Sequence, residues 1–176
     1  IKYGQKLFSA FGNSPMGYAL PASIGASLFI NKKKIICIDG DGSLLLSIQD
    51  LSTVKKLNLP IKIFILNNNG YGIIKQFQEL YLNKKYQATG EEVSVKNFRK
   101  ISSGFGINYN LIKNNTQLKV LKKIISSNKP EIIELILDEN EKIVPKLIFG
   151  KPIEDLSPLL SREELKINTR FINEKM

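Results

Sequence analysis

Histidine is absent from this chain of 176 residues, and cysteine occurs only once. The absence of histidine excludes imidazole acid–base catalysis, Ser-His-Asp triads and histidine-ligated metals for this chain acting alone. A single cysteine cannot form a disulfide within the chain, which is typical of proteins of the reducing cytoplasm, and we expect that location. Cys37 lies in the middle of an apolar, β-branched run, so we expect an unreactive buried thiol.

Long apolar runs are also absent. No stretch reaches the roughly 18–20 apolar residues that span a membrane, so we expect no membrane association. No cleavable signal is recognisable, and the chain begins with Ile rather than Met. We therefore expect the chain to be the C-terminal part of a longer polypeptide.

Acidic residues are outnumbered, because 26 Lys and Arg against 16 Asp and Glu give a formal net charge of +10. A nucleic-acid-binding face would explain such a charge. However, 23 of the 26 basic residues are lysines, scattered in pairs such as Lys55-Lys56 and Lys122-Lys123. Nucleic-acid readers favour arginine in a stripe with aromatic neighbours, so we expect no nucleic-acid partner.

Two stretches in the middle of the chain, residues 34–43 and 63–72, each begin with a short apolar, β-branched run. Each ends abruptly in small and polar residues, as a buried parallel strand does where it reaches a site. Between them, residues 43–58 predict a helix with one apolar face, made of Leu44, Ile48, Leu51 and Val54. The three segments together predict a right-handed strand–helix–strand crossover.

The rest of the chain also alternates strands with helices, which predicts an α/β fold. Further strands are expected at residues 5–8, 108–112 and 131–137, for about five or six strands in the sheet. Further helices are expected at 16–29, 73–82, 96–105 and after an N-cap at Thr116, with a surface loop over 83–95.

We expect residues 1–137 to form the main domain and residues 138–176 to form a C-terminal arm. The arm carries several prolines and a capping-box pattern that begins at Ser161. It either wraps over the domain or is a disordered tail.

The polar residues at the ends of the two central runs predict a binding site. Asp41 follows the first run and Asn68 follows the second, 27 positions later (68 − 41). The carboxyl ends of parallel strands meet at one edge of a sheet, so these side chains are expected to converge. A carboxylate, an amide oxygen and loop carbonyls suit Mg²⁺. Residues that would let a phosphate approach closely, or bind it at a helix start, are Gly40, Gly42, Ser43, Gly70 and Gly72.

Two other interpretations of this pair remain. Asp and Asn also form turns at the edge of an ordinary α/β sheet. Alternatively, Asp41 could hold Mg²⁺ for a nucleoside triphosphate in a binding module. The chain has neither a Gly-x-x-x-x-Gly-Lys-[Ser/Thr] loop nor a Gly-x-Gly-x-x-Gly turn after the first strand.

Gly40-Asp41-Gly42 followed by Asn67-Asn68 resembles the signature of thiamine diphosphate enzymes. Three further stretches, residues 16–22, 49–51 and 72–78, extend the resemblance to the acetolactate synthase family, over roughly residues 5–150. The resemblance implies a doubly wound α/β domain with a mostly parallel sheet and helices on both faces. It also implies thiamine diphosphate and Mg²⁺ as cofactors and leaves FAD open.

The resemblance implies roles for individual residues. The cofactor-binding positions would be Ser14, Met16, Gly40, Gly42, Ser43, Asn68, Tyr71, Gly72 and Ile73. The metal ligands would be Asp41, Asn68 and the backbone carbonyl of Gly70, and the substrate channel would include Gln76 and Phe77. Met16 would hold the two cofactor rings in a bent shape. The competing interpretation of Met16 and Phe77 is that they fill the core.

The resemblance further implies an enzyme that decarboxylates a 2-keto acid and transfers the bound aldehyde unit to a carbonyl acceptor. A simple 2-keto-acid decarboxylase, with one or two kinds of chain, is the alternative. In this family the activating glutamate belongs to the N-terminal domain of a neighbouring subunit, and Glu91 and Glu92 do not match it. We therefore expect no catalytic residue on this chain, no activity from it alone, and a homodimeric or tetrameric enzyme.

Overall fold

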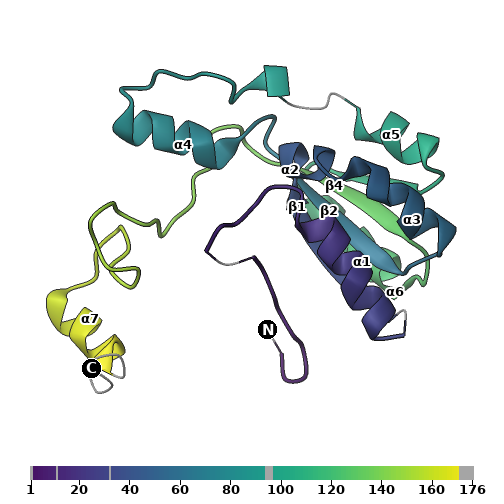
Figure 1. Cartoon of the computed structure of the whole chain (residues 1–176), viewed down its shortest axis with the longest axis horizontal. Coiled ribbons are helices and arrows are strands. Elements are labelled where there is room, and N and C mark those ends of the chain that lie inside the picture. Colours follow the sequence, from purple (N-terminus) through teal and green to yellow (C-terminus); the bar gives the residue numbers. More distant parts are fainter. Residues whose placement is uncertain (1, 11, 32, 94–96, 171–176) are drawn as a thin grey trace. The chain divides into compact units, whose positions relative to one another are not determined.

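The computed structural model describes residues 2–10, 12–31, 33–93 and 97–170 (Figure 1). Contacts divide the chain into two compact units, residues 1–141 and residues 142–176. The first unit contains the sheet, and the described part of the second unit contains one helix, α7 (Arg162–Asn168).

The sheet of the first unit has four parallel strands in the described residues. The strands are β1 (Ile35–Gly40), β2 (Ile61–Asn67), β3 (Asn108–Ile112) and β4 (Glu131–Ile136), in the spatial order β1-β2-β4-β3. Residues 5–8 form no strand, so that expectation and the larger strand count were wrong. Leu7 and Phe8 are exposed there. Because these two apolar side chains stay in solvent, no apolar burial stabilises a strand at this position.

The helices follow the expected alternation with the strands. In the first unit they are α1 (Ala19–Phe29), α2 (Asp41–Leu45), α3 (Leu51–Lys56), α4 (Gly72–Tyr81), α5 (Phe98–Gly104) and α6 (Leu121–Ser126). Three short 3-10 segments are Ile48–Asp50, Glu91–Val93 and Asn115–Val120. No helix within the described ranges is both long and apolar enough to cross a membrane.

Two apolar cores lie on opposite faces of the sheet. Side chains alternate between the faces along a strand. Thus Ile63 of β2 packs in the larger core and its neighbour Phe64 packs in the smaller one. The larger core takes Leu20 from α1, together with residues of α2, α3 and α5, and the smaller takes Ile124 from α6. Helices therefore cover both faces, as a doubly wound fold requires.

Two local expectations differ from the structure. Residues 43–58 do not form one helix but α2, a 3-10 turn and α3, because the backbone at Ser47 leaves the helical region (φ −131°, ψ 20°). Leu44, Leu51 and Val54 of the expected apolar face are nevertheless fully buried. The side-chain cap is Asn114 rather than Thr116, and it precedes the 3-10 segment Asn115–Val120 that leads into α6: the Asn114 Oδ1 accepts from the Thr116 amide at 3.1 Å.

In the second unit, the expected cap at Ser161 is present. Its hydroxyl oxygen accepts a hydrogen bond from the backbone amide of Glu164 at 3.1 Å, at the start of α7. An ion pair between Asp155 and Arg162, with a closest distance of 2.9 Å, ties the segment before α7 to its first turn.

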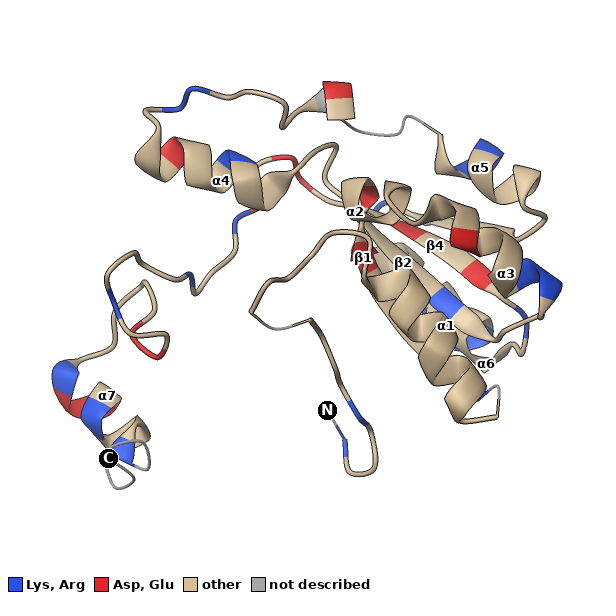
Figure 2. Ribbon diagram, viewed as in Figure 1, with Lys and Arg blue, Asp and Glu red and all other residues tan. Residues whose placement is uncertain are grey.

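Lysine and arginine residues are distributed over several helices and connecting segments rather than gathered in one stripe (Figure 2). The strands themselves also carry charge: Lys62 of β2 and Glu131 and Glu134 of β4 are buried within the sheet. Charged side chains inside a sheet need partners.

Candidate cofactor site

The crossover from β1 to β2 brings Asp41 against the loop that follows β2. Asp41 begins α2 directly after β1, and it is only 2% exposed. Its Oδ2 accepts a hydrogen bond from the backbone amide of Gly70 at 3.1 Å. The expected approach of the two strand ends is therefore present, across 29 positions of sequence.

Asn68 lies in this loop and is held closely by its surroundings. A β-carbon added to Gly72 would stand 2.3 Å from the Asn68 Nδ2, so only glycine leaves room for that amide. The backbone amide of Asn69 donates to the Asn67 Oδ1 at 3.0 Å, which closes a turn around Asn68. The loop thus presents Asn68 in a defined position.

Gly42 and Tyr71 form a second close approach between the two strand ends. A β-carbon on Gly42 would lie 2.1 Å from a ring carbon of Tyr71, so the ring rests directly on the glycine backbone. Tyr71 in turn donates its backbone amide to the carbonyl oxygen of Thr89 at 3.0 Å. This contact brings the loop after α4 to the site.

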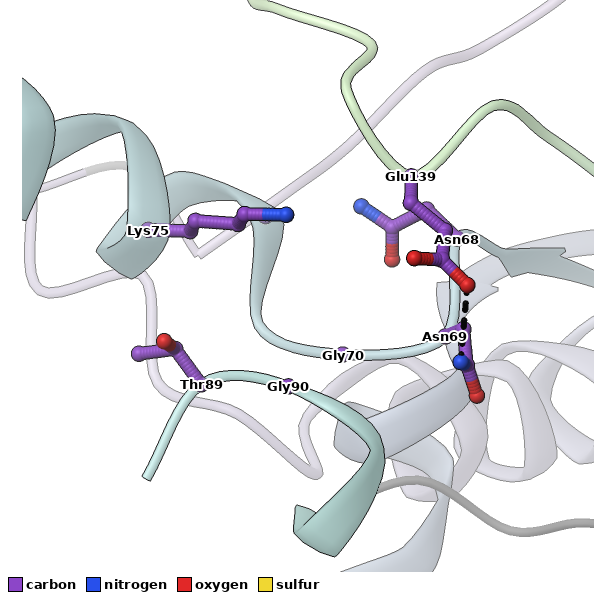
Figure 3. A pocket seen from close by; sticks show the side chains of 8 residues that line it. Asn68, Asn69, Gly70, Lys75, Thr89, Gly90 and Glu139 are labelled. Carbon is purple, nitrogen blue, oxygen red and sulfur yellow. Dashed lines mark hydrogen bonds between the residues drawn. The ribbon is translucent and has the colours of Figure 1, made fainter. Parts of the chain in front are cut away.

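The loop around Asn68 and the segment near Thr89 border a pocket (Figure 3). The pocket is lined by Asn68, Asn69, Gly70, Gly72, Lys75, Thr89, Gly90 and Glu139. Lys75 extends from α4 into the pocket, and Glu139 reaches over it from the segment after β4. The Asn69 Nδ2 donates to the Glu139 carboxylate at 2.8 Å.

The sequence patterns did not identify Lys75, Thr89 and Glu139 as site residues. Lys75 lies inside one of the family-like stretches, which was a usable signal. Thr89 and Glu139 lie in segments without any motif. Thr89 is held in place by Gln78, the buried residue of α4, whose Oε1 accepts from the Thr89 hydroxyl at 3.3 Å.

The segment before α1 is tied to the same site. The hydroxyl oxygen of Ser43 accepts a hydrogen bond from the backbone amide of Gly17 at 3.0 Å. Ser14, with φ 42°, and Met16 lie on this segment. Met16 is 39% exposed, so the structure does not support it as a core residue.

Asp39, near the end of β1, is a buried carboxyl close to Ser43. Burial raises the pKa of its carboxyl above the ordinary 3.8, and hydrogen bonding from the Ser43 hydroxyl and the Gly40 amide opposes that rise. Among the described residues, no hydrogen bond reaches the buried Asp39 Oδ2. The sequence pattern gave no reason to single out Asp39.

Helix α4 carries the residues expected near cofactor and substrate. Ile73 is 66% exposed, Gln76 is half-buried and Phe77 is 38% exposed. The Phe77 ring centroid lies 5.0 Å from that of Tyr81. The structure therefore does not place Phe77 in the core.

A family model described as the thiamine pyrophosphate enzyme, C-terminal TPP binding domain, matches residues 1–135. The chain belongs to this family. Thiamine pyrophosphate (TPP) is another name for thiamine diphosphate, so the resemblance that rested on Gly40–Gly42 and Asn67-Asn68 is confirmed at the level of the family.

This TPP-binding domain is also similar to acetolactate synthase large subunits. It is 33% identical over 144 residues to that of Porphyra purpurea, covering 81% of this chain and 24% of the relative. It is 32% identical over 158 residues to the large subunit of isozyme 2 of Escherichia coli, covering 89% of this chain and 29% of the relative. It is 34% identical over 148 residues to the mitochondrial acetolactate synthase of Schizosaccharomyces pombe, covering 84% of this chain and 22% of the relative. The chain thus spans about a quarter of the length of these relatives.

The residues present at the site fit a hydrated Mg²⁺ bound to a diphosphate. Asp41 offers a buried carboxylate, Asn68 an amide oxygen and Gly70 a carbonyl, which are hard oxygen donors. The described residues contain no group of three or more His, Cys, Asp and Glu side chains that could hold a metal ion. The expected donor set has only one carboxylate, that of Asp41.

Proposed function

We propose that this domain anchors thiamine diphosphate through Mg²⁺ in an acetolactate synthase-like enzyme. That enzyme decarboxylates a 2-keto acid and transfers the bound aldehyde unit to a carbonyl acceptor. The observation that carries the proposal is the buried contact of the Asp41 carboxylate with the Gly70 amide. It joins two segments that each bring oxygen donors to one edge of the sheet, and the family match and the acetolactate synthase relatives agree with it.

When bound, thiamine diphosphate supplies the carbon nucleophile and the electron sink for decarboxylation. The residues of this chain bind and orient it. Asp41, Asn68 and the Gly70 carbonyl would hold the metal, while Gly40, Gly42, Ser43 and Gly72 would let the diphosphate approach the backbone. Ser14, Met16, Tyr71 and Ile73 would surround the rest of the cofactor. Gln76 and Phe77 would border the substrate.

The activating acid is proposed to come from the N-terminal domain of a second subunit. The chain covers only about a quarter of the length of its relatives, and those relatives have room for such a domain. The active enzyme would then be a homodimer or homotetramer in the cytoplasm. The rival nucleotide-binding module receives no support from the family match.

Calorimetric titration of the full-length protein tests the proposal. Thiamine diphosphate with Mg²⁺ is expected to bind, and ATP with Mg²⁺ is not. Asp41→Ala should weaken the cofactor affinity by on the order of a thousandfold, because Asp41 would be the charged ligand of the metal that holds the diphosphate. Asn68→Ala should be milder, because water replaces a neutral ligand more easily.

Glu163→Ala, which removes an exposed carboxylate of α7, is the control and should leave the affinity unchanged. Unchanged cofactor affinity in Asp41→Ala would refute the metal assignment. Preferential binding of ATP would favour the nucleotide-binding module.

A further inference from the structure

We infer that Asn67, Glu134 and Tyr109 form a hydrogen-bonded relay that positions the metal-binding loop, residues 68–70. We name these three side chains the strand-end relay. Its role rests on the proposed metal-binding function of that loop. None of the three was expected to act at the site from sequence. They come from β2, β4 and β3, and the loop follows directly after β2.

Asn67 is the member that touches the loop. Its Nδ2 donates to the Glu134 Oε1 at 2.6 Å, and its Oδ1 accepts from the backbone amide of Asn69 at 3.0 Å. One side of the amide therefore faces the sheet and the other faces the loop. Because the carboxylate can only accept, the Asn67 amide cannot rotate by a half-turn without losing both bonds.

Glu134 links Asn67 to the next strand. It is 6% exposed, and its Oε2 accepts a short hydrogen bond from the Tyr109 hydroxyl. The register explains the geometry. Glu134 pairs with Ile65 of β2 and with Leu111 of β3. Asn67 follows Ile65 by two positions and Tyr109 precedes Leu111 by two, so both side chains lie on the same face of the sheet as that of Glu134. Each oxygen of the buried carboxylate thus meets a donor from a different neighbouring strand.

Tyr109 keeps the donor role in this relay. Burial, the hydrogen bond to Glu134 and the charge of that carboxylate all raise the pKa of the phenol, so the hydroxyl stays protonated. The Arg99 guanidinium lies over the Tyr109 ring, 5.3 Å from its centroid, and places a positive charge near the buried pair.

A second buried glutamate on β4 provides an internal comparison. Glu131 is 7% exposed, and its Oε2 accepts from the Asn110 Nδ2 at 3.2 Å. It also lies 3.9 Å from the Nζ of Lys62, and that Nζ donates to the carbonyl of Lys129 at 2.5 Å. These partners of Glu131 lie at the amino-terminal end of the sheet and in β3, not in the loop. The two glutamates have similar burial, but only Glu134 is connected to the loop through Asn67.

We expect removal of the relay to weaken Mg²⁺ binding more than it lowers the stability of the fold. The test is a Mg²⁺ titration of the full-length protein by calorimetry at saturating thiamine diphosphate, with the melting temperature of the cofactor-free protein measured in parallel. Asn67→Ala and Glu134→Leu should weaken Mg²⁺ binding by about 10- to 100-fold, as is typical when the support of a metal ligand is removed. Tyr109→Phe, which removes one hydroxyl, should give a smaller loss in the same direction.

Two variants separate positioning from general stability. Glu134→Gln keeps an oxygen for Asn67 and an amide for the Tyr109 oxygen, so it should retain most of the Mg²⁺ affinity that Glu134→Leu loses. Asn110→Ala removes the corresponding bond to Glu131 and should lower the melting temperature about as much as Tyr109→Phe while leaving Mg²⁺ affinity within about twofold.

Mg²⁺ affinity that stays at the wild-type level in Tyr109→Phe and in every folded variant of Asn67 would overturn the relay, whatever the melting temperatures. If the wild-type protein itself binds no Mg²⁺ with thiamine diphosphate, the proposed function fails first and the relay fails with it. Tyr109→Phe and Glu134→Gln change the fewest atoms, so the test does not depend on whether Asn67→Ala folds.

Discussion

The Asn68 side-chain amide occupies the space where a β-carbon on Gly72 would stand, at 2.3 Å from that position. The atom in the way is the end of a side chain that can rotate, not backbone. A residue larger than glycine at position 72 would therefore move Asn68 rather than disrupt the fold.

We expect Gly72→Ala to change the free energy of unfolding by less than about 1 kcal/mol, because alanine favours the helix that begins there. Mg²⁺-dependent binding of thiamine diphosphate should nevertheless weaken by at least tenfold, since the displaced Asn68 amide is a proposed metal ligand. Calorimetry and denaturant unfolding measure the two effects. Gly104→Ala, at the end of α5 with open space around it, is the control and should leave cofactor affinity unchanged. Equal affinities for the two variants would contradict the role of Asn68.

Met16→Ala tests how the cofactor rings are held. Met16 is 39% exposed, so truncation should cost well below the roughly 2–5 kcal/mol of a buried methionine. If the side chain supports the bent cofactor, turnover should fall more than cofactor affinity, because the diphosphate anchor is elsewhere. Leu28→Ala in α1, with a similarly exposed side chain, is the matched control. A large drop in melting temperature with turnover per folded molecule unchanged would show that Met16 is a packing residue.

Asp39→Asn should stabilise the protein at neutral pH. The folded state holds a proton on Asp39 above pH 3.8, where the unfolded chain has lost it, because burial raises the folded pKa. The free energy of unfolding of the wild type therefore falls as pH rises through the window between 3.8 and the raised pKa. The advantage of the asparagine variant should grow across the same window and level off above the raised pKa. Denaturant unfolding at several pH values measures it.

Asp155→Asn should behave in the opposite way. The hydrogen bond and charge of Arg162 lower the pKa of Asp155, so the stability it contributes is present above its unfolded pKa and is lost as the pH falls. The asparagine variant should therefore be less stable than the wild type at neutral pH, and this difference in stability should disappear in acid. A pH-independent difference in either variant would contradict the assigned cause.

Cys37 should be unreactive in the folded protein. Burial raises the pKa of its thiol to about 11, so roughly one molecule in ten thousand carries the thiolate at pH 7. Peptide mapping after brief iodoacetamide treatment should find Cys37 unmodified in native protein and modified after denaturation. Rapid labelling of the native protein would show that β1 opens, or that the thiol is less buried than the structure places it.

Much of this arrangement follows from local sequence. Buried parallel strands have nearly continuous β-branched runs, and Asp41 and Asn68 follow the polar ends of two such runs, so the crossover and the edge that bears the site could be predicted. The family resemblance also rests on contiguous motifs. Where signals were short, local reasoning failed: residues 5–8 form no strand, residues 43–58 are interrupted at Ser47, and Asn114 replaces Thr116 as the cap.

Only the tertiary structure decided which distant residues support the site. The bond from Asn67 to Glu134 spans 67 positions and depends on the register of β4 between β2 and β3. Thr89 and Glu139 reach the pocket from segments without regular patterns, and Asp39 owes its raised pKa to burial at the end of β1. A sequence pattern reports the period of an element and the chemistry at its ends. The pairing of side chains across strands depends on register and packing, which are properties of the whole sheet.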